Sequence, residues 1–203
     1  MHGCGILFAR KQKEDTPMPE QTASRLRTRD LTLIALFTAL MAVCAWLSIP
    51  VPRPFVQFTM QTFAVFTALL TLGGKRGTYT VAAYLLLGAV GAPVFSNFRG
   101  GPGVLLGTTG GYILGFFFTA LLYWLLTARL GEGFPVRITA CLLGMATYYA
   151  FGTAWYLALT FQSGSPVGLM TALSYCVFPF IVPDLVKLAL AMLLSHRVGK
   201  YIQ

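Results

Sequence analysis

The sequence predicts an all-α membrane protein: a six-transmembrane-helix bundle with a glycine-rich external loop and a short external helix before the last span. Of its 203 residues, 56% are hydrophobic and 10% are charged, and the mean hydropathy is +0.71. Soluble domains carry about 25% charged residues, so this composition does not provide a water-exposed surface. The apolar runs are long and continuous, whereas a membrane β-barrel needs short alternating segments.

Apolar runs that approach the roughly 20 residues needed to cross a bilayer core define the predicted spans. Segments rich in glycine or proline separate these runs. The second and sixth runs are short for a complete crossing. The six predicted spans comprise residues 30–49, 57–73, 77–95, 107–128, 137–161 and 183–200.

Basic residues gather on one side of these spans. Residues 1–29 hold six of the fifteen Lys and Arg, and the loops after spans two and four and the C-terminus hold two each. Only Arg53 and Arg99 fall on the opposite side, and Lys187 lies inside a span. The positive-inside rule therefore predicts a multi-pass protein of the cell membrane with both termini in the cytoplasm. We expect residues 1–29 to form a basic cytoplasmic tail and residues 30–203 to form one six-helix transmembrane domain.

The remaining composition argues against several classes of function. The net charge of +9 does not indicate nucleic-acid binding, because the charges lie between apolar runs and not on one basic face with interleaved aromatics. The four cysteines fit no metal-ligand spacing, and the two histidines lie near the chain ends. Apart from Asp30, the first residue of span one, Asp184 is the only acidic residue within the predicted spans, so paired-acid chemistry is not supported. The sequence predicts a protein that binds a ligand, not an enzyme, and no cofactor or metal.

Asp184 and Lys187 are the most informative pair in the chain. They lie in the otherwise apolar stretch FPFIVPDLVKLALAMLLSH and, at a spacing of i and i+3, share a helix face. Ionisable side chains in hydrocarbon are costly unless they are paired or face a polar cavity. One interpretation is a self-neutralising ion pair that stabilises the last span. The other is a binding site, in which Asp184 accepts N–H donors and Lys187 donates to a bound polar group.

The segment before the last span predicts a separate short element. Residues 166–178 are apolar but too short to cross a membrane, so we expect an external interfacial helix or lid. Pro183 suits the first turn of the following helix, where its missing N–H is no loss. Asp184 would then lie at the positive end of that helix dipole. The alternative is one long kinked helix over residues 168–196.

A glycine-rich loop is the second candidate site element. Residues 91–103 and 107–112 contain glycines that permit close backbone approach to a ligand. Close helix packing through glycines at positions 107, 111 and 115 is an alternative use of the same pattern. That alternative does not explain the polar residues Asn97 and Arg99 in the loop.

Two weaker patterns lie in the first two spans. Gln57, Thr59, Gln61 and Thr62 cluster at the outer end of span two, where they either line a cavity or cap a helix. Ala35 and Ala39 form a small-residue step in span one, which lets another helix approach closely. Within a helix bundle such a step usually serves internal packing.

Three stretches of the chain resemble the BioY family, the biotin-binding S components of energy-coupling factor (ECF) transporters. They are GAPVFSNFRGGPGVLLGTTGGYILGF (91–116), FTMQT (58–62) and PFIVPDLVKLALA (179–191). The resemblance covers about residues 30–200 and leaves out the first 29. The family more often has Gly-Pro-Thr-Gly-Gly-Tyr where this chain has Gly-Thr-Thr-Gly-Gly-Tyr at 107–112.

The resemblance implies that biotin is the transported substrate and binds in a pocket open to the outside. Asp184 would accept hydrogen bonds from the ureido ring, and Lys187 and Asn97 would donate to the ureido carbonyl. Tyr112, together with Phe95 and Phe98, would form the apolar walls. The donor to the biotin carboxylate stays open among Arg99, Arg53, the Gln61 amide and backbone N–H groups.

The resemblance also implies partners in the lipid bilayer. In S components a small-residue stripe on the first helix docks against the ECF transmembrane coupling subunit, which assigns that role to Ala35 and Ala39. The chain has no ATPase motif, so active uptake requires two ATPase subunits as well. Transport without partners is an open alternative. The competing functions are an S component for another vitamin, an intramembrane enzyme acting on a lipid or isoprenoid, and a structural membrane subunit.

Overall fold

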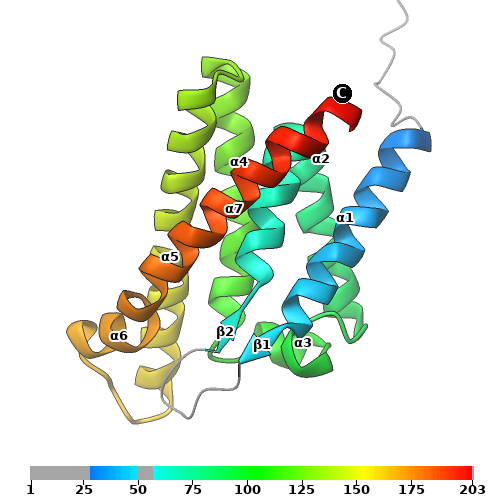
Figure 1. Ribbon diagram of the computed structural model, residues 1–203. Helices are drawn as coiled ribbons and strands as arrows, with labels where there is room; N and C mark the ends of the chain where they lie inside the picture. The colour runs from blue at the N-terminus through cyan, green and yellow to red at the C-terminus, as the bar shows by residue number, and fades with distance from the viewer. Residues whose placement is uncertain (1–27, 50–56, 203) are drawn as a thin grey trace, which may run out of the picture.

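The computed structural model describes residues 28–49 and 57–202, with side chains through residue 200. Its described part is almost entirely helical, with one small antiparallel strand pair that the sequence analysis did not predict (Figure 1). Most of the predicted cytoplasmic tail, and Arg53, lie outside the described residues. The elements are α1 (Thr28–Trp46), β1 (Ser48–Ile49), β2 (Phe58–Thr59), α2 (Gln61–Val90), η1 (Ser96–Phe98), α3 (Pro102–Leu105), α4 (Gly110–Leu130), α5 (Phe134–Gln162), α6 (Leu169–Cys176) and α7 (Phe178–Ile202).

Helix α2 is a tight hairpin of two antiparallel helices. Gly73 has φ 80° and ψ 173°, a backbone conformation that glycine adopts readily and other residues avoid. A Cβ placed on Gly77 would lie 3.0 Å from the Cα of Leu69, which is possible only because the chain reverses between them. The predicted second and third spans are therefore separate helices, at residues 61–72 and 74–90.

Helices α4 and α5 form a second hairpin, packed closely through glycine. A Cβ on Gly111 would lie 2.3 Å from the Cβ of Trp155, and one on Gly115 would lie 2.8 Å from the Cβ of Tyr148. Both glycines thus serve the close packing that their spacing indicates. Gly107 does not belong to this seam, and its carbonyl instead accepts a hydrogen bond from Trp155 Nε1 at 3.1 Å.

The last helix begins earlier than predicted. Helix α6 occupies the segment where a short helix was expected, and only Val177 separates it from α7. Because α7 begins at Phe178, Pro183 lies inside the helix and not in its first turn. The expectation that the N-terminal helix dipole stabilises Asp184 is therefore wrong. Side-chain donors take that role, as described below.

The elements divide between two ends of the bundle (Figure 1). The start of α1, the turn within α2, the α4–α5 turn and the end of α7 lie at one end, and the strands, α3 and α6 lie at the other. Among the described basic residues, Arg99 alone belongs to the segments at the strand end, and Lys187 lies between the ends within α7. The segments at the first end carry Arg29, Lys75, Arg76, Arg129, Arg137, Arg197 and Lys200.

Three described helical segments are long and apolar enough to cross a membrane by length and composition alone. They are Thr28–Trp46, Gly110–Leu130 and Leu169–Lys200, the last of which joins α6 to most of α7. The other three predicted spans are also helical, as the two halves of α2 and as α5. The central helices of the bundle are the α2 hairpin, which packs against α1, α4 and α7.

Candidate functional site

A cavity opens between the α2 hairpin, α4, α5 and α7, near the strand end of the bundle. It encloses about 550 Å³ of empty space, part of which is open to solvent. Small-molecule sites combine mostly apolar walls with a few polar groups, and this cavity has both. The lining residues are Gln57, Thr59, Gln61, Thr62, Ser96, Thr109, Tyr112, Ile113, Phe116, Tyr148, Tyr149, Cys176, Phe180, Asp184 and Lys187.

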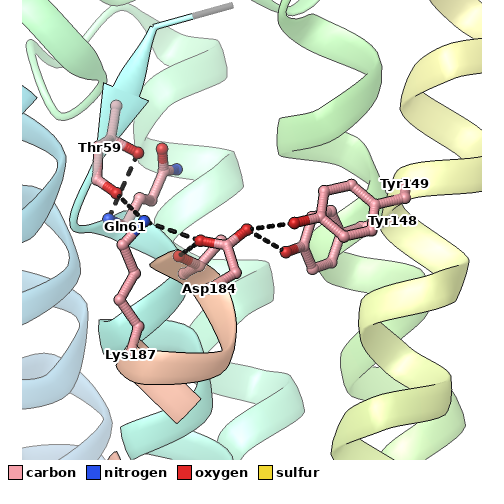
Figure 2. A network of polar contacts seen from close by, with 7 residues as sticks. Thr59, Gln61, Tyr148, Tyr149, Asp184 and Lys187 are labelled. Atoms are coloured by element: carbon pink, nitrogen blue, oxygen red, sulfur yellow. Dashed lines mark hydrogen bonds and ion pairs between the residues drawn. The ribbon is translucent and has the colours of Figure 1, made fainter. Parts of the chain in front are cut away.

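The Asp184 carboxylate accepts four hydrogen bonds from side chains on three helices (Figure 2). Its Oδ1 accepts from Thr62 Oγ1 at 3.0 Å and from Lys187 Nζ at 2.8 Å. Its Oδ2 accepts from the hydroxyl groups of Tyr148 at 2.6 Å and Tyr149 at 2.7 Å. Asp184 is 3% exposed, and hydrogen bonds to a charged acceptor are the strong kind, so this shell offsets the cost of burying the carboxylate.

Lys187 is held from three directions. Its Nζ donates to Asp184 and to the backbone carbonyl of Thr59 at 2.7 Å, and it lies 4.1 Å from the centroid of the Phe58 ring. Lys187 is 4% exposed, so the ion pair brings two opposite charges and no net charge into the protein interior. The two groups are satisfied by several neighbours as well as by each other, and both lie on the cavity wall.

The polar cluster at the start of α2 lines this cavity as a group. The N-cap residue of α2 is Met60, which makes no side-chain cap, and Thr59 Oγ1 accepts a hydrogen bond from the Gln61 N–H in the first turn at 3.4 Å. Gln61 Nε2 donates to the Tyr84 hydroxyl at 2.9 Å, and Tyr84 in turn donates to the Val94 carbonyl at 2.9 Å. These two hydrogen bonds use one of the two amide N–H groups of Gln61 and hold the Gln61 side chain at the cavity wall.

Aromatic residues form the apolar part of the wall. Tyr112 lines the cavity as expected, and its hydroxyl shares a 3.1 Å hydrogen bond with Thr153. Its ring lies against Gly152, where a Cβ would be 2.3 Å from the Tyr112 ring. Of the other two expected wall residues, Phe95 is buried against Tyr84 and Phe98 stacks on Trp46. Neither lines the cavity.

Asn97 and Arg99 are exposed and do not line the cavity, although their neighbour Ser96 does. Asn97 has φ 58°, in the left-handed region, and its Oδ1 accepts a 3.4 Å hydrogen bond from Ser48 Oγ. The backbone carbonyl of Arg99 accepts from the Phe95 N–H at 2.9 Å. The structure thus brings Asp184, Lys187, Tyr112 and Gln61 together and leaves these two loop residues outside the group.

Tyr148 and Tyr149 are the site residues that sequence reasoning missed. They are adjacent residues in the middle of α5, and both hydroxyl groups reach Asp184. The signal was present, because a tyrosine hydroxyl deep in an apolar span needs a hydrogen-bond partner, and Asp184 is a carboxylate well inside another span. Among the described residues, no cluster of three or more His, Cys, Asp or Glu could hold a metal ion.

Comparison with known proteins places this chain in a family. A family model described as "BioY family" matches residues 18–203. The chain belongs to the BioY family. The match begins within the N-terminal segment that we expected to lie outside the resemblance.

The chain aligns over most of its length with proteins named as BioY biotin transporters. It is 42% identical to the "Biotin transporter BioY" of Thermotoga maritima over 172 residues, which cover 85% of this chain and 96% of the relative. It is 38% identical to the "Probable biotin transporter BioY" of Pyrococcus horikoshii over 173 residues, which cover 85% and 98%.

Two solved structures share the fold. The S-component for biotin from an ECF-type ABC transporter superposes with a TM-score of 0.73 at 30% identity, covering 85% of this chain and 91% of that one. The S component of a bacterial ECF transporter superposes with a TM-score of 0.56 at 16% identity, covering 86% and 98%. The second likeness is one of fold alone.

Proposed function

We propose that this BioY protein is the substrate-binding subunit of a vitamin importer, which captures biotin from the external side for ATP-driven uptake with ECF partner subunits. The observation that carries the proposal is the buried Asp184–Lys187 pair on the wall of a cavity, in a chain whose relatives are named biotin transporters. The family is one of transporters, so the protein is not an enzyme, and biotin is its substrate and not a cofactor.

The chemistry of the pair matches the ureido ring of biotin. That ring offers two N–H donors and one carbonyl acceptor. Asp184 accepts from a ring N–H, and Lys187 donates to the carbonyl. A site built to pair such groups discriminates strongly against analogues that lack them, because an unmatched ligand leaves buried polar groups without partners.

The rest of the cavity suits the remainder of the molecule. Tyr112 and the neighbouring aromatic rings contact the sulfur ring and the alkyl tail. Of the candidate side-chain donors to the biotin carboxylate, Gln61 is the one that already lines the cavity. Arg99 and Asn97 join the site only if ligand binding draws their loop inward, and Arg53 lies outside the described residues.

The exposed face of α1 is the proposed docking surface for the ECF transmembrane coupling subunit. Ala35 and Ala39 are both exposed, whereas Phe37 and Met41 point into the bundle. Two small residues one helical turn apart let a partner helix approach closely in a membrane. The assembly is completed by two ATPase subunits, since the chain itself carries no nucleotide-binding motif.

The proposed topology has six spans in the cell membrane. The segments rich in Lys and Arg occupy one end of the bundle, and the positive-inside rule assigns that end to the cytoplasm. Both termini are then cytoplasmic, with residues 1–29 as a basic tail and residues 30–203 as the substrate-binding domain. The cavity, the glycine-rich loop and α6 face the outside.

Competition binding tests the substrate assignment. Radiolabelled biotin is bound to the detergent-purified chain and challenged with an excess of unlabelled biotin or of other vitamins. Displacement by biotin alone is the expected result. Displacement by a different vitamin at lower concentration would instead assign the chain to an S component for that vitamin.

A further inference from the structure

The hydrogen-bonding capacity of the Asp184 carboxylate is already filled by the protein. An ionised carboxylate has about four lone-pair sites. Thr62 and Lys187 occupy Oδ1, and Tyr148 and Tyr149 occupy Oδ2. A ligand N–H that binds Asp184 must therefore displace one of these four donors.

Three of the four donors are fixed in place. Thr62 and Lys187 are 7% and 4% exposed, and Lys187 is also tied to the Thr59 carbonyl. Tyr148 is 3% exposed, its Cβ lies in the gap left by Gly115, and its ring packs edge-on against Phe116 with the centroids 5.3 Å apart. Movement of any of these side chains would disturb packed helices.

Tyr149 is the donor that is free to leave. Its side chain is only partly buried, and it lines the cavity (Figure 2). Its ring contacts the ring of Tyr148 at a centroid distance of 4.5 Å. A rotation of the Tyr149 side chain would break the 2.7 Å hydrogen bond to Asp184 Oδ2 and leave the other three donors in place.

We propose that the Tyr149 hydroxyl occupies the hydrogen-bonding position on Asp184 Oδ2 that a ligand N–H takes in the complex, and that the ligand binds by displacing this hydroxyl. This inference rests on the proposed function and adds a specificity-determining residue to it. A ligand with an N–H donor replaces the lost hydrogen bond to Asp184. A ligand without an N–H donor either displaces Tyr149 and leaves Asp184 Oδ2 with one donor fewer, or binds while Tyr149 still occupies part of the cavity. Tyr149 therefore lowers the affinity of ligands that fit the cavity but carry no N–H donor.

Two measurements on Tyr149→Phe, biotin affinity and thermal unfolding, test whether biotin breaks the hydrogen bond from Tyr149 to Asp184. The variant no longer has to break this bond when biotin binds, so it should bind biotin about tenfold more tightly than the wild type. Dethiobiotin, which keeps the ureido ring, should show the same gain. Tyr79→Phe, at an exposed position on α2 away from the cavity, is the control, and its affinity for biotin should equal that of the wild type.

Thermal unfolding in detergent gives the second readout. Without biotin, Tyr149→Phe should melt about 2–4 °C below the wild type, because one hydrogen bond is lost. At saturating biotin the two melting temperatures should converge, since that bond is broken in both complexes. Thr78→Val removes a buried hydroxyl that donates to Ala120 O at 3.0 Å far from the cavity, so its deficit should be the same with and without biotin.

The outcomes separate this inference from the proposed function. Wild-type protein that fails to bind biotin overturns the proposed function and this inference with it. Wild-type protein that binds biotin, together with a Tyr149→Phe variant of unchanged or weaker affinity, overturns the inference alone. A melting deficit of Tyr149→Phe that persists at saturating biotin does the same, because the bond would then survive in the complex.

Discussion

Gln61 and Tyr84 lie 23 positions apart in α2, yet the Gln61 amide donates to the Tyr84 hydroxyl at 2.9 Å. A straight helix would place them about 35 Å apart at a rise of 1.5 Å per residue. The bond therefore joins the two antiparallel halves of the hairpin at the level of the cavity. It also links the cavity wall to the glycine-rich loop, since Tyr84 donates onward to Val94.

Substitution at the hairpin turn should destabilise the protein. Gly73→Ala forces an L-residue to adopt φ 80° with ψ 173°, a region that is essentially restricted to glycine, which costs about 1–3 kcal/mol. We expect a lower melting temperature in detergent. Gly103→Ala is the matched control, because φ at Gly103 is not in the left-handed region and a Cβ there meets no atom within 4 Å. Equal melting temperatures for the two variants would contradict this account of the turn.

Enlarging Gly152 should weaken ligand binding without touching a polar site residue. The new Cβ of Gly152→Ala would lie 2.3 Å from the Tyr112 ring, so the ring must move into the cavity that it lines. Small-to-large changes at packed positions cost about 1–3 kcal/mol. Titration with biotin should show a loss of affinity for this variant and none for Gly199→Ala, whose new Cβ meets no atom within 4 Å near the end of α7. Wild-type affinity in Gly152→Ala would remove Tyr112 from the proposed site.

The buried ion pair makes opposite predictions for stability and for binding. Lys187→Met leaves Asp184 without its counter-ion and should destabilise the fold by about 3–5 kcal/mol. Adding Asp184→Asn removes the unpaired charge and should restore much of that stability. Biotin binding should be lost in both variants. A double variant that regains stability and also binds biotin would show that the pair is purely structural.

The exposed alanine step on α1 should matter for transport and not for binding. Ala39→Trp places a bulky ring on the proposed docking surface, away from the cavity, and we expect unchanged biotin affinity with loss of coupled uptake in cells that carry the ECF partners. Leu125→Trp, at an exposed position of α4, is the control and should transport normally. Normal uptake by Ala39→Trp would reject the docking role.

The helical segments were predictable because apolar runs and glycine-rich breaks are local features of the sequence. Each of the six predicted segments is mainly helical, although residues 48–49 and 58–59 at the ends of the first two form strands, and the reversal at Gly73 falls at the predicted break. The start of α7 was not predicted, because proline is common in first turns and the sequence alone does not show that the helix extends upstream of Pro183. The β1–β2 pair was missed because two-residue strands leave no periodic pattern.

The site was only partly predictable. Asp184 and Lys187 are conspicuous because charge is rare in hydrocarbon, and Gln61 is part of a local polar cluster. Tyr148 and Tyr149 reach Asp184 from another helix, and such contacts depend on how α5 packs against α7. Asn97 was expected in the site both as a polar residue of the glycine-rich loop and from the resemblance. Its left-handed backbone conformation places the side chain beside Ser48 and not in the cavity.

Calorimetric titration of biotin into the detergent-purified chain, with wild-type protein and Asp184→Asn side by side, tests the central claim most directly. The wild type should bind one biotin per chain. Asp184→Asn should lose at least about 2 kcal/mol of binding free energy, since a buried partner of the ureido ring is left unmatched. That loss corresponds to about thirtyfold in Kd. Absence of wild-type binding, or equal affinity of the two proteins, would contradict the account.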